Sequence, residues 1–275
     1  MKERKLQEIG KSLLVTVPKS WADELNLRKG SPVRMSVTDR GALMISPEFV
    51  SAKERKGARI AFDASGERRF FREYFGGADR IIIDLKERAR ADLQSFLGGF
   101  MNVQVVEESE KRVVIKLFPV DEFSMEECLA RMHFLSLGLF DEAAKGSAYA
   151  VRDSLEGSLT KFYYLLVLQV RGFLSEGRFA SARVPLIRAM DMRMVAERIE
   201  RMADILKRAQ LRSWEARELE LVKQFYVRAF GCFRDEEFDA AVPVWAEERA
   251  LRKRIQSVQG MQLLRLAKEI SSFVR

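Results

Sequence analysis

Histidine and cysteine, which often take part in catalysis and metal binding, are rare in this sequence. Its 275 residues include one histidine, His133, and two cysteines, Cys128 and Cys232. One histidine argues against histidine-based metalloenzymes and Ser-His-Asp hydrolases, and two cysteines are too few for a disulfide framework or a zinc ligand set. There is also no P-loop, Gly-x-Ser-x-Gly or HExxH motif. We therefore expect no enzyme, with His133 packed in a helix and both cysteines buried.

Positive charge is the other chemically informative feature. Lys and Arg number 48 against 40 Asp and Glu, so the net charge is +8 and the isoelectric point is about 9.5. Residues 1–50 hold 9 basic and 6 acidic residues, whereas the remaining 225 hold 39 and 34. The N-terminal fifth is thus the more basic part per residue, and this balance permits nucleic acid as a partner.

Composition indicates the broad class of protein. Apolar residues make up 47% and charged residues 32%, which is typical of a globular chain with a sizeable core. No stretch approaches the ~20 apolar residues of a membrane span, and no apolar leader segment follows Met1–Lys5. We expect a reduced, cytoplasmic protein without membrane insertion.

Residues 1–50 show the pattern of short strands and tight turns. The expected elements are a strand through Leu13, Val15 and Val17, a short helix with Ser20 as its N-cap, and a hairpin of Val33–Val37 and Leu43–Ile45 around Asp39-Arg40-Gly41. A unit of this size cannot bury its own core. We therefore expect a homodimer or a higher oligomer.

Three runs in this segment resemble the AbrB/MazE-like swapped-hairpin DNA-binding domain over about residues 1–48. They are Arg4–Lys11, Val15–Lys19 and Leu27–Val33. The resemblance implies that two chains interlace their hairpins into one β-barrel, and that basic side chains near its two-fold axis contact double-stranded DNA. The candidate DNA-binding residues are then Arg4, Lys5, Lys11 and Lys19.

Lys11 takes a place that arginine often holds in that family. Lysine supplies a point charge to a phosphate but no bidentate recognition of guanine. The alternative interpretation of these four basic residues is ordinary surface solubility.

The rest of the chain changes character twice. Residues 51–120 predict a small α/β module, with strands at 59–62, 80–85, 103–107 and 113–117, helices at 66–75 and 88–100, and a hairpin tip at Glu108–Lys111. From 121 to 275 apolar stripes predict helices alone, including Met192–Gln210, Ser213–Arg234, Phe238–Gln256 and Met261–Arg275. The expected fold class is a multidomain α+β protein, with the barrel in 1–50, the module in 51–120 and an all-α bundle in 121–275.

The central and C-terminal segments resemble archaeal PhoU-type phosphate-uptake regulators. The resemblance is carried by Tyr74–Ile81, Leu97–Phe100, Val105–Ser109 and Ala196–Asp204. It implies a PhoU-like helical bundle of two three-helix units with metal-binding acidic residues four positions apart. Glu200 and Asp204 keep that spacing, which places both carboxylates on one helix face. Oxygen ligands so placed suit a hard or borderline divalent cation.

Other acidic positions of the PhoU pattern are missing. Glu156 alone remains in the preceding helix, and Glu247 and Glu248 are followed four positions on by Leu251 and Arg252. The metal site of the PhoU pattern is therefore eroded, in that most of its acidic ligands are missing. Two interpretations of Glu200 and Asp204 stay open. They bind a divalent metal, or they form an exposed pair that bridges to Arg201 and Arg208.

These features leave three functional hypotheses. The first is a DNA-binding transcriptional regulator, of phosphate uptake by the resemblance, whose PhoU-like domain senses a signal or binds a partner. The second is a PhoU-like adaptor that docks on a phosphate-transport or signalling protein without binding DNA, with the barrel as a dimerisation clamp. The third is an antitoxin-like protein, because the small barrel also occurs in antitoxins.

Overall fold

The fold is that of a computed structural model, which describes residues 4–37, 41–47, 57–85, 90–119, 123–175, 184–210 and 215–274. The chain divides into two compact units. The first is Met1–Glu54 with Ala180–Ala182, and the second is Arg55–Phe179 with Arg183–Arg275. Within the described ranges, strands end at Leu117 and only helices follow, so the protein is α+β. No helix in those ranges is long and apolar enough to cross a membrane.

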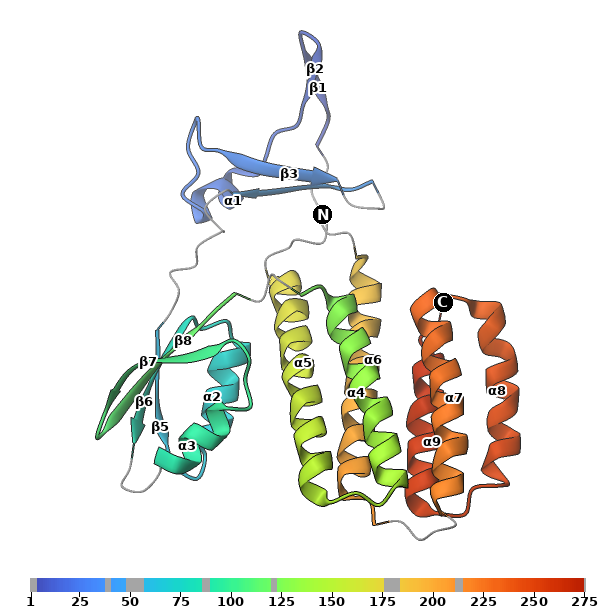
Figure 1. The fold of residues 1–275 in the computed structure, drawn as a ribbon. Helices are drawn as coiled ribbons and strands as arrows, with labels where there is room; N and C mark the ends of the chain where they lie inside the picture. Colours follow the sequence, from blue (N-terminus) through green and yellow to red (C-terminus); the bar gives the residue numbers. More distant parts are fainter. Residues whose placement is uncertain are drawn as a thin grey trace. The chain divides into compact units, whose positions relative to one another are not determined.

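Two antiparallel hairpins and a short helix make up the first unit (Figure 1). The elements are β1 (Gln7–Ile9), β2 (Ser12–Leu14), α1 (Lys19–Glu24), β3 (Val33–Val37) and β4 (Leu43–Pro47). β1 pairs with β2 and β3 pairs with β4, in two separate sheets. The predicted hairpin of β3 and β4 is confirmed, although Asp39 and Arg40 of its turn lie outside the described residues. Two open hairpins in one chain do not make a barrel, and the swapped barrel of two chains stays a prediction.

Two predictions for this unit are wrong. Val15 and Val17 are not in a strand, because β2 ends at Leu14 and β1 offers no further residues for pairing. An alternating run becomes a strand only where a neighbouring strand takes its backbone hydrogen bonds. Ser20 is not an N-cap, since α1 begins at Lys19 and its N-cap is Pro18. Proline is tolerated there because the first N–H groups of a helix have no intrahelical partner.

A four-stranded sheet with two helices begins the second unit. Its elements are β5 (Ala58–Phe62), α2 (Gly66–Phe75), β6 (Arg80–Leu85), α3 (Arg90–Leu97), β7 (Val103–Ser109) and β8 (Arg112–Leu117). The strand order is β5-β6-β8-β7, and β5 runs parallel to β6. A parallel pair needs a crossover, which α2 provides. Positions 88 and 89 of the predicted helix 88–100 lie outside the described residues, and Glu108 and Ser109, predicted in the hairpin tip, belong to β7.

Six helices, as far as the described ranges extend, complete the second unit. They are α4 (Met125–Ala144), α5 (Tyr149–Ser175), α6 (Leu186–Arg208), α7 (Glu215–Asp235), α8 (Phe238–Arg252) and α9 (Val258–Ser271). α4, α5 and α6 pack on one another, as do α7, α8 and α9. The two sets meet through α6 against α9 and α4 against α7 (Figure 1). The likeness to PhoU itself stays a prediction.

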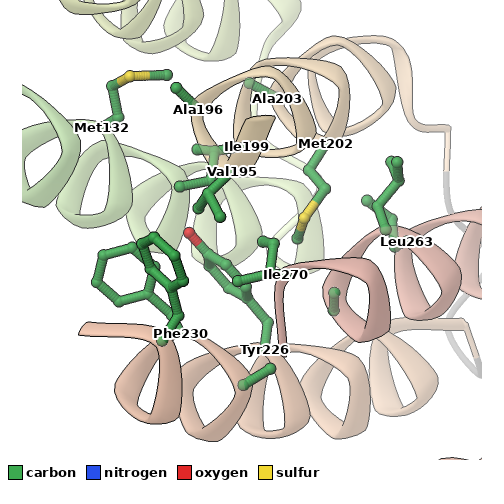
Figure 2. Packing of buried hydrophobic residues seen from close by; sticks show 14 of the residues in the cluster. Met132, Val195, Ala196, Ile199, Met202, Ala203, Tyr226, Phe230, Leu263 and Ile270 are labelled. Atoms are coloured by element: carbon green, nitrogen blue, oxygen red, sulfur yellow. The ribbon is translucent and has the colours of Figure 1, made fainter. Parts of the chain in front are cut away.

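The core of these helices is continuous across both sets. Figure 2 shows side chains of α4, α6, α7 and α9 converging, among them Met132, Ile199, Tyr226 and Ile270. Each of these four is fully buried. The predicted helix ends near the C-terminus are corrected, because α8 stops at Arg252 rather than at 256 and α9 begins at Val258 rather than at 261.

Candidate nucleic-acid interface and carboxylate pair

The four predicted DNA-binding residues all lie in the first unit and are all exposed. Arg4 and Lys5 precede β1, and Lys19 opens α1. Lys11 follows Gly10 in the two-residue turn between β1 and β2. Gly10 has a φ of +64°, a conformation that glycine adopts without strain and that two-residue hairpin turns require. The turn therefore presents the Lys11 ammonium at the tip of a hairpin.

Three further basic residues of this unit were not among the predicted DNA-binding residues. Arg28 and Lys29 precede the Gly30 turn, and Arg34 lies on β3. Residues 4–37 thus hold seven basic against three acidic side chains. Among the described residues of the first unit, none of these charges takes part in an ion pair, in contrast to the many pairs of the second unit. The charge balance of the segment is the signal that could have found them.

No described side chain of this unit is buried in a single chain. Val33, Met35 and Val37 share one face of β3 and lie opposite Pro47, Ile45 and Leu43 of β4. Met35 is 58% exposed and Val37 is 62% exposed. An isolated two-stranded hairpin is marginal in water, so this apolar face needs a cover that the other described residues of the first unit do not supply.

The predicted carboxylate pair lies on α6. The Oδ1 atom of Asp204 is 3.4 Å from Nη2 of Arg208, as the ion-pair interpretation expects. Arg201 instead pairs with Glu197, with Nη2 and Oε1 2.6 Å apart. Glu200 is half-buried, and its pKa is raised to about 7 by burial first, then by the charges of Asp204 and Glu156.

The surroundings of the pair do not complete a metal site. The ammonium of Lys207 is 2.8 Å from Oε2 of Glu156 and 3.4 Å from Oδ1 of Asp153, so a side-chain cation already neutralises this acidic region. Within the ranges that the structure describes, no group of three or more His, Cys, Asp or Glu is arranged to hold a metal. Hard cations take six or more oxygen ligands. Metal binding at Glu200 and Asp204 therefore stays a prediction.

The histidine and the two cysteines are packed within helices α4 and α7. The His133 ring stacks on Phe230 with centroids 3.9 Å apart, and its Nδ1 lies 2.8 Å from the Tyr226 hydroxyl. Burial, and secondarily the charge of Arg234, lowers the pKa of His133 to about 4. Cys128 and Cys232 are both buried, and burial raises the pKa of both thiols, to about 12 for Cys128. The packing predictions for all three residues are confirmed.

The comparisons with known proteins concern the first unit. Residues 6–51 match the family model described as "Antidote-toxin recognition MazE, bacterial antitoxin". No curated protein and no solved structure matches the chain. The MazE-like part of the predicted resemblance is therefore confirmed at the N-terminus. The comparisons give no support to a PhoU-like domain or to an archaeal origin.

Proposed function

We propose that this chain is a non-catalytic DNA-binding regulator that acts as a homodimer through its N-terminal unit. The observation that carries the proposal is the combination of unpaired positive charge and uncovered apolar surface within residues 4–47. The match of residues 6–51 to a MazE family model supports it independently.

A second copy is the cover that best suits the exposed face of β3 and β4. Covering a side chain of the size of Met35 or Val37 contributes roughly 1.5–3 kcal/mol. Identical hairpins present identical apolar faces, so an interface around a two-fold axis is self-complementary. Interlaced hairpins would also bring two sets of basic residues to one surface.

The positive surface then binds DNA mainly through phosphates. Each Lys or Arg that contacts a phosphate releases condensed counterions, so affinity falls steeply with salt. Lys11 and Lys19 act as point charges that position the duplex. Arg4, Arg28 and Arg34 carry guanidinium groups, which can also read guanine in the major groove.

Fluorescence anisotropy across a salt series tests this proposal. The full-length chain is titrated onto a labelled duplex from upstream of its own gene and onto a scrambled duplex. We expect tighter binding to the native duplex. The double variant Lys11→Ala/Lys19→Ala should bind more weakly, with a salt slope reduced by about one unit per lost phosphate contact. A dimer loses each contact twice.

The matched control is Lys253→Ala, which removes an exposed lysine at the end of α8. It should leave both affinity and salt slope unchanged. Equal loss in Lys253→Ala would show that only net charge matters, and no binding by the full chain at low salt would rule out the DNA-binding proposal.

Antitoxin-type regulation is a second candidate, favoured by the description of the matched family. In that case the chain also binds a separate toxin protein. A tagged chain isolated from its native host should then co-elute with a stoichiometric partner that arrests growth when it is expressed alone. Isolation of the homodimer without such a partner would leave the regulator as the better account.

Phosphate uptake and docking on a phosphate-transport or signalling protein rested on the PhoU resemblance. Because no comparison supports that resemblance, neither is part of this proposal.

A further inference from the structure

A groove between helices α6 and α9 combines a sizeable hollow with a concentration of arginine. Its volume is about 480 Å³, which is within the range of small-molecule binding sites. α6 contributes Arg201, Asp204 and Arg208, and α9 contributes Arg265. All of these residues belong to the second unit, so the groove shares no residue with the basic surface of the N-terminal unit.

Basic side chains outnumber acidic ones in the groove lining, which holds three guanidinium groups and one carboxylate. Two further carboxylates outside the lining, Glu197 and Glu269, pair with Arg201 and Arg265. A phosphate monoester carries about −1.5 to −2 near pH 7, and the planar fork of arginine matches its oxygens. Arg201 is held by Glu197 at 2.6 Å, which leaves Arg208 and Arg265 as the arginines best able to turn toward a ligand.

The present partners of these two arginines are weak. Nη2 of Arg208 is 3.4 Å from Oδ1 of Asp204, and Nε of Arg265 is 3.6 Å from Oε1 of Glu269. The two arginine side chains are 71% and 69% exposed. Exposed ion pairs between residues four apart contribute little to stability. A phosphoryl group that offers shorter, bidentate contacts would replace them at low cost.

A buried arginine adds to the positive potential beside the groove. Arg152 is 7% exposed, and its Nη1 donates to the carbonyl oxygens of Leu206, at 3.3 Å, and Ala209. Ala209 itself lines the groove. Among the described residues, no carboxylate pairs with Arg152. The last carbonyls of α6, which would otherwise repel an anion, are thus neutralised by an unpaired cation.

The groove lining also includes apolar and amide side chains that suit the organic part of a ligand. Ile205 and Leu266 line the groove with apolar side chains, and Gln259 and Gln262 line it from the first turns of α9. The amides of glutamine both donate and accept hydrogen bonds, so they suit hydroxyls or the edge of a base. The volume exceeds what one phosphoryl group occupies, which favours a larger ligand over inorganic phosphate.

We propose that the α6–α9 groove binds a small phosphorylated organic molecule, a phosphate monoester of a nucleoside or a sugar. Arg208 and Arg265 hold the phosphoryl group, and Ile205 and Leu266 contact the organic part. The site does not depend on DNA binding by the N-terminal unit, so each proposal stands or fails by its own experiment.

Isothermal titration calorimetry on the full-length chain tests the site. The probes are adenosine monophosphate, glucose 6-phosphate, adenosine, inorganic phosphate and citrate. We expect saturable binding of at least one of the two esters, and weaker binding of the other three probes. Arg208→Gln and Arg265→Gln should each weaken ester binding about tenfold or more, and Arg265→Lys should lose less, because it keeps the charge without the fork.

Two further variants separate binding from folding. Asp204→Asn removes the one acidic charge of the lining and should tighten ester binding several-fold, a gain that a misfolded chain cannot show. Arg249→Gln, at an exposed position of α8 outside the groove, should leave affinity unchanged.

Three results would overturn the proposal. They are no saturable binding of either ester below about 1 mM, inorganic phosphate or citrate binding as tightly as the esters, and equal loss of affinity in Arg249→Gln and Arg265→Gln. Thermal melting of each variant confirms that the chain is folded in the titration.

Discussion

Glu218 accepts two hydrogen bonds from Ser257, one from its backbone N–H at 3.0 Å and one from its hydroxyl at 2.6 Å. The other carboxylate oxygen accepts from the backbone N–H of Gln256 at 2.7 Å. The Ser257 hydroxyl oxygen in turn accepts from the N–H of Gly260 at 3.1 Å, as the N-cap of α9. A buried carboxylate of α7 thus satisfies the free N–H groups at the start of α9.

Replacing Glu218 with Gln should destabilise the helical part of the protein. The amide keeps one acceptor oxygen but turns a donor group toward the donors of Gln256 and Ser257. Hydrogen bonds to charged groups contribute about 1.5–3 kcal/mol each, so we expect a loss of about 2–3 kcal/mol in the free energy of unfolding at pH 7. Urea denaturation measures it, with Glu220→Gln, an exposed residue of the same helix, as control.

The Glu218 carboxylate should make the free energy of unfolding depend on pH. Burial raises the pKa of Glu218, but the hydrogen bonds from Ser257 and Gln256 outweigh it and hold the pKa below its usual value. Its contribution is therefore present above the unfolded pKa near 4.3 and is lost as pH falls through the folded pKa. Unfolding curves between pH 7 and pH 3 should differ less between wild type and Glu218→Gln at the acidic end. A constant difference would contradict this assignment.

Gly260→Ala should destabilise the protein although alanine favours helices. A Cβ atom at Gly260 would lie 2.6 Å from Oγ of Ser257 and 2.8 Å from Cγ2 of Ile255, distances that force the N-cap apart. We expect a loss of about 1–3 kcal/mol. Gly157→Ala in α5 is the matched control, because a Cβ atom at Gly157 would meet no other atom within 4 Å. This control should gain up to about 1 kcal/mol in the free energy of unfolding. If thermal unfolding shows that both substitutions change stability in the same direction, the packing argument is wrong.

Glu200→Gln should stabilise the protein at neutral and alkaline pH. The folded pKa of Glu200 is raised to about 7, so the native state holds a proton that the unfolded state has lost. Stability therefore falls as pH rises from about 4 to 7. The variant should lack this decline and gain on the order of 1–2 kcal/mol at pH 8 in urea unfolding. If Mn²⁺ or Mg²⁺ instead raises the melting temperature of wild type and Glu200→Gln abolishes the rise, the metal interpretation of this pair is correct.

Met35→Asp should abolish self-association of the chain. Met35 lies opposite Ile45 on the uncovered face of β3 and β4, and a charge there cannot be covered by a second copy. Arg34→Gln, on the opposite face of the same strand, should keep the dimer. Sedimentation velocity distinguishes the two variants. If the wild-type chain sediments as a monomer, the prediction of a homodimer through the apolar face of β3 and β4 is wrong.

Much of the fold could be predicted from periodicity. Val33, Met35 and Val37 alternate, and β3 forms there; Phe70 and Tyr74 lie one helical turn apart, and α2 buries both. The prediction failed at Val15 and Val17, where the pattern of a strand exists without a partner strand. Alternation reports which side chains prefer burial, but a strand also needs a neighbour for its backbone.

The candidate sites were predicted to different degrees. The ordered motif from Arg4 to Val33 identified the MazE-like segment, because the spacing of turns, strands and basic residues lies within one short run of sequence. The pairing of Lys207 with Glu156, which neutralises the acidic region near Glu200, could not be predicted in the same way. Its two residues come from different helices, whose relative rotation depends on the whole core.

By itself, the sequence determined the order of elements from α1 onward, the apolar face of β3 and α2 and the basic character of the first unit, since all three follow from residue types at short spacing. Only the tertiary structure decided that Glu218 caps α9, that Arg152 neutralises the end of α6, and that three arginines line one groove. These contacts join residues far apart in the chain. Their geometry is set by helix packing, which depends on the fit of many side chains at once.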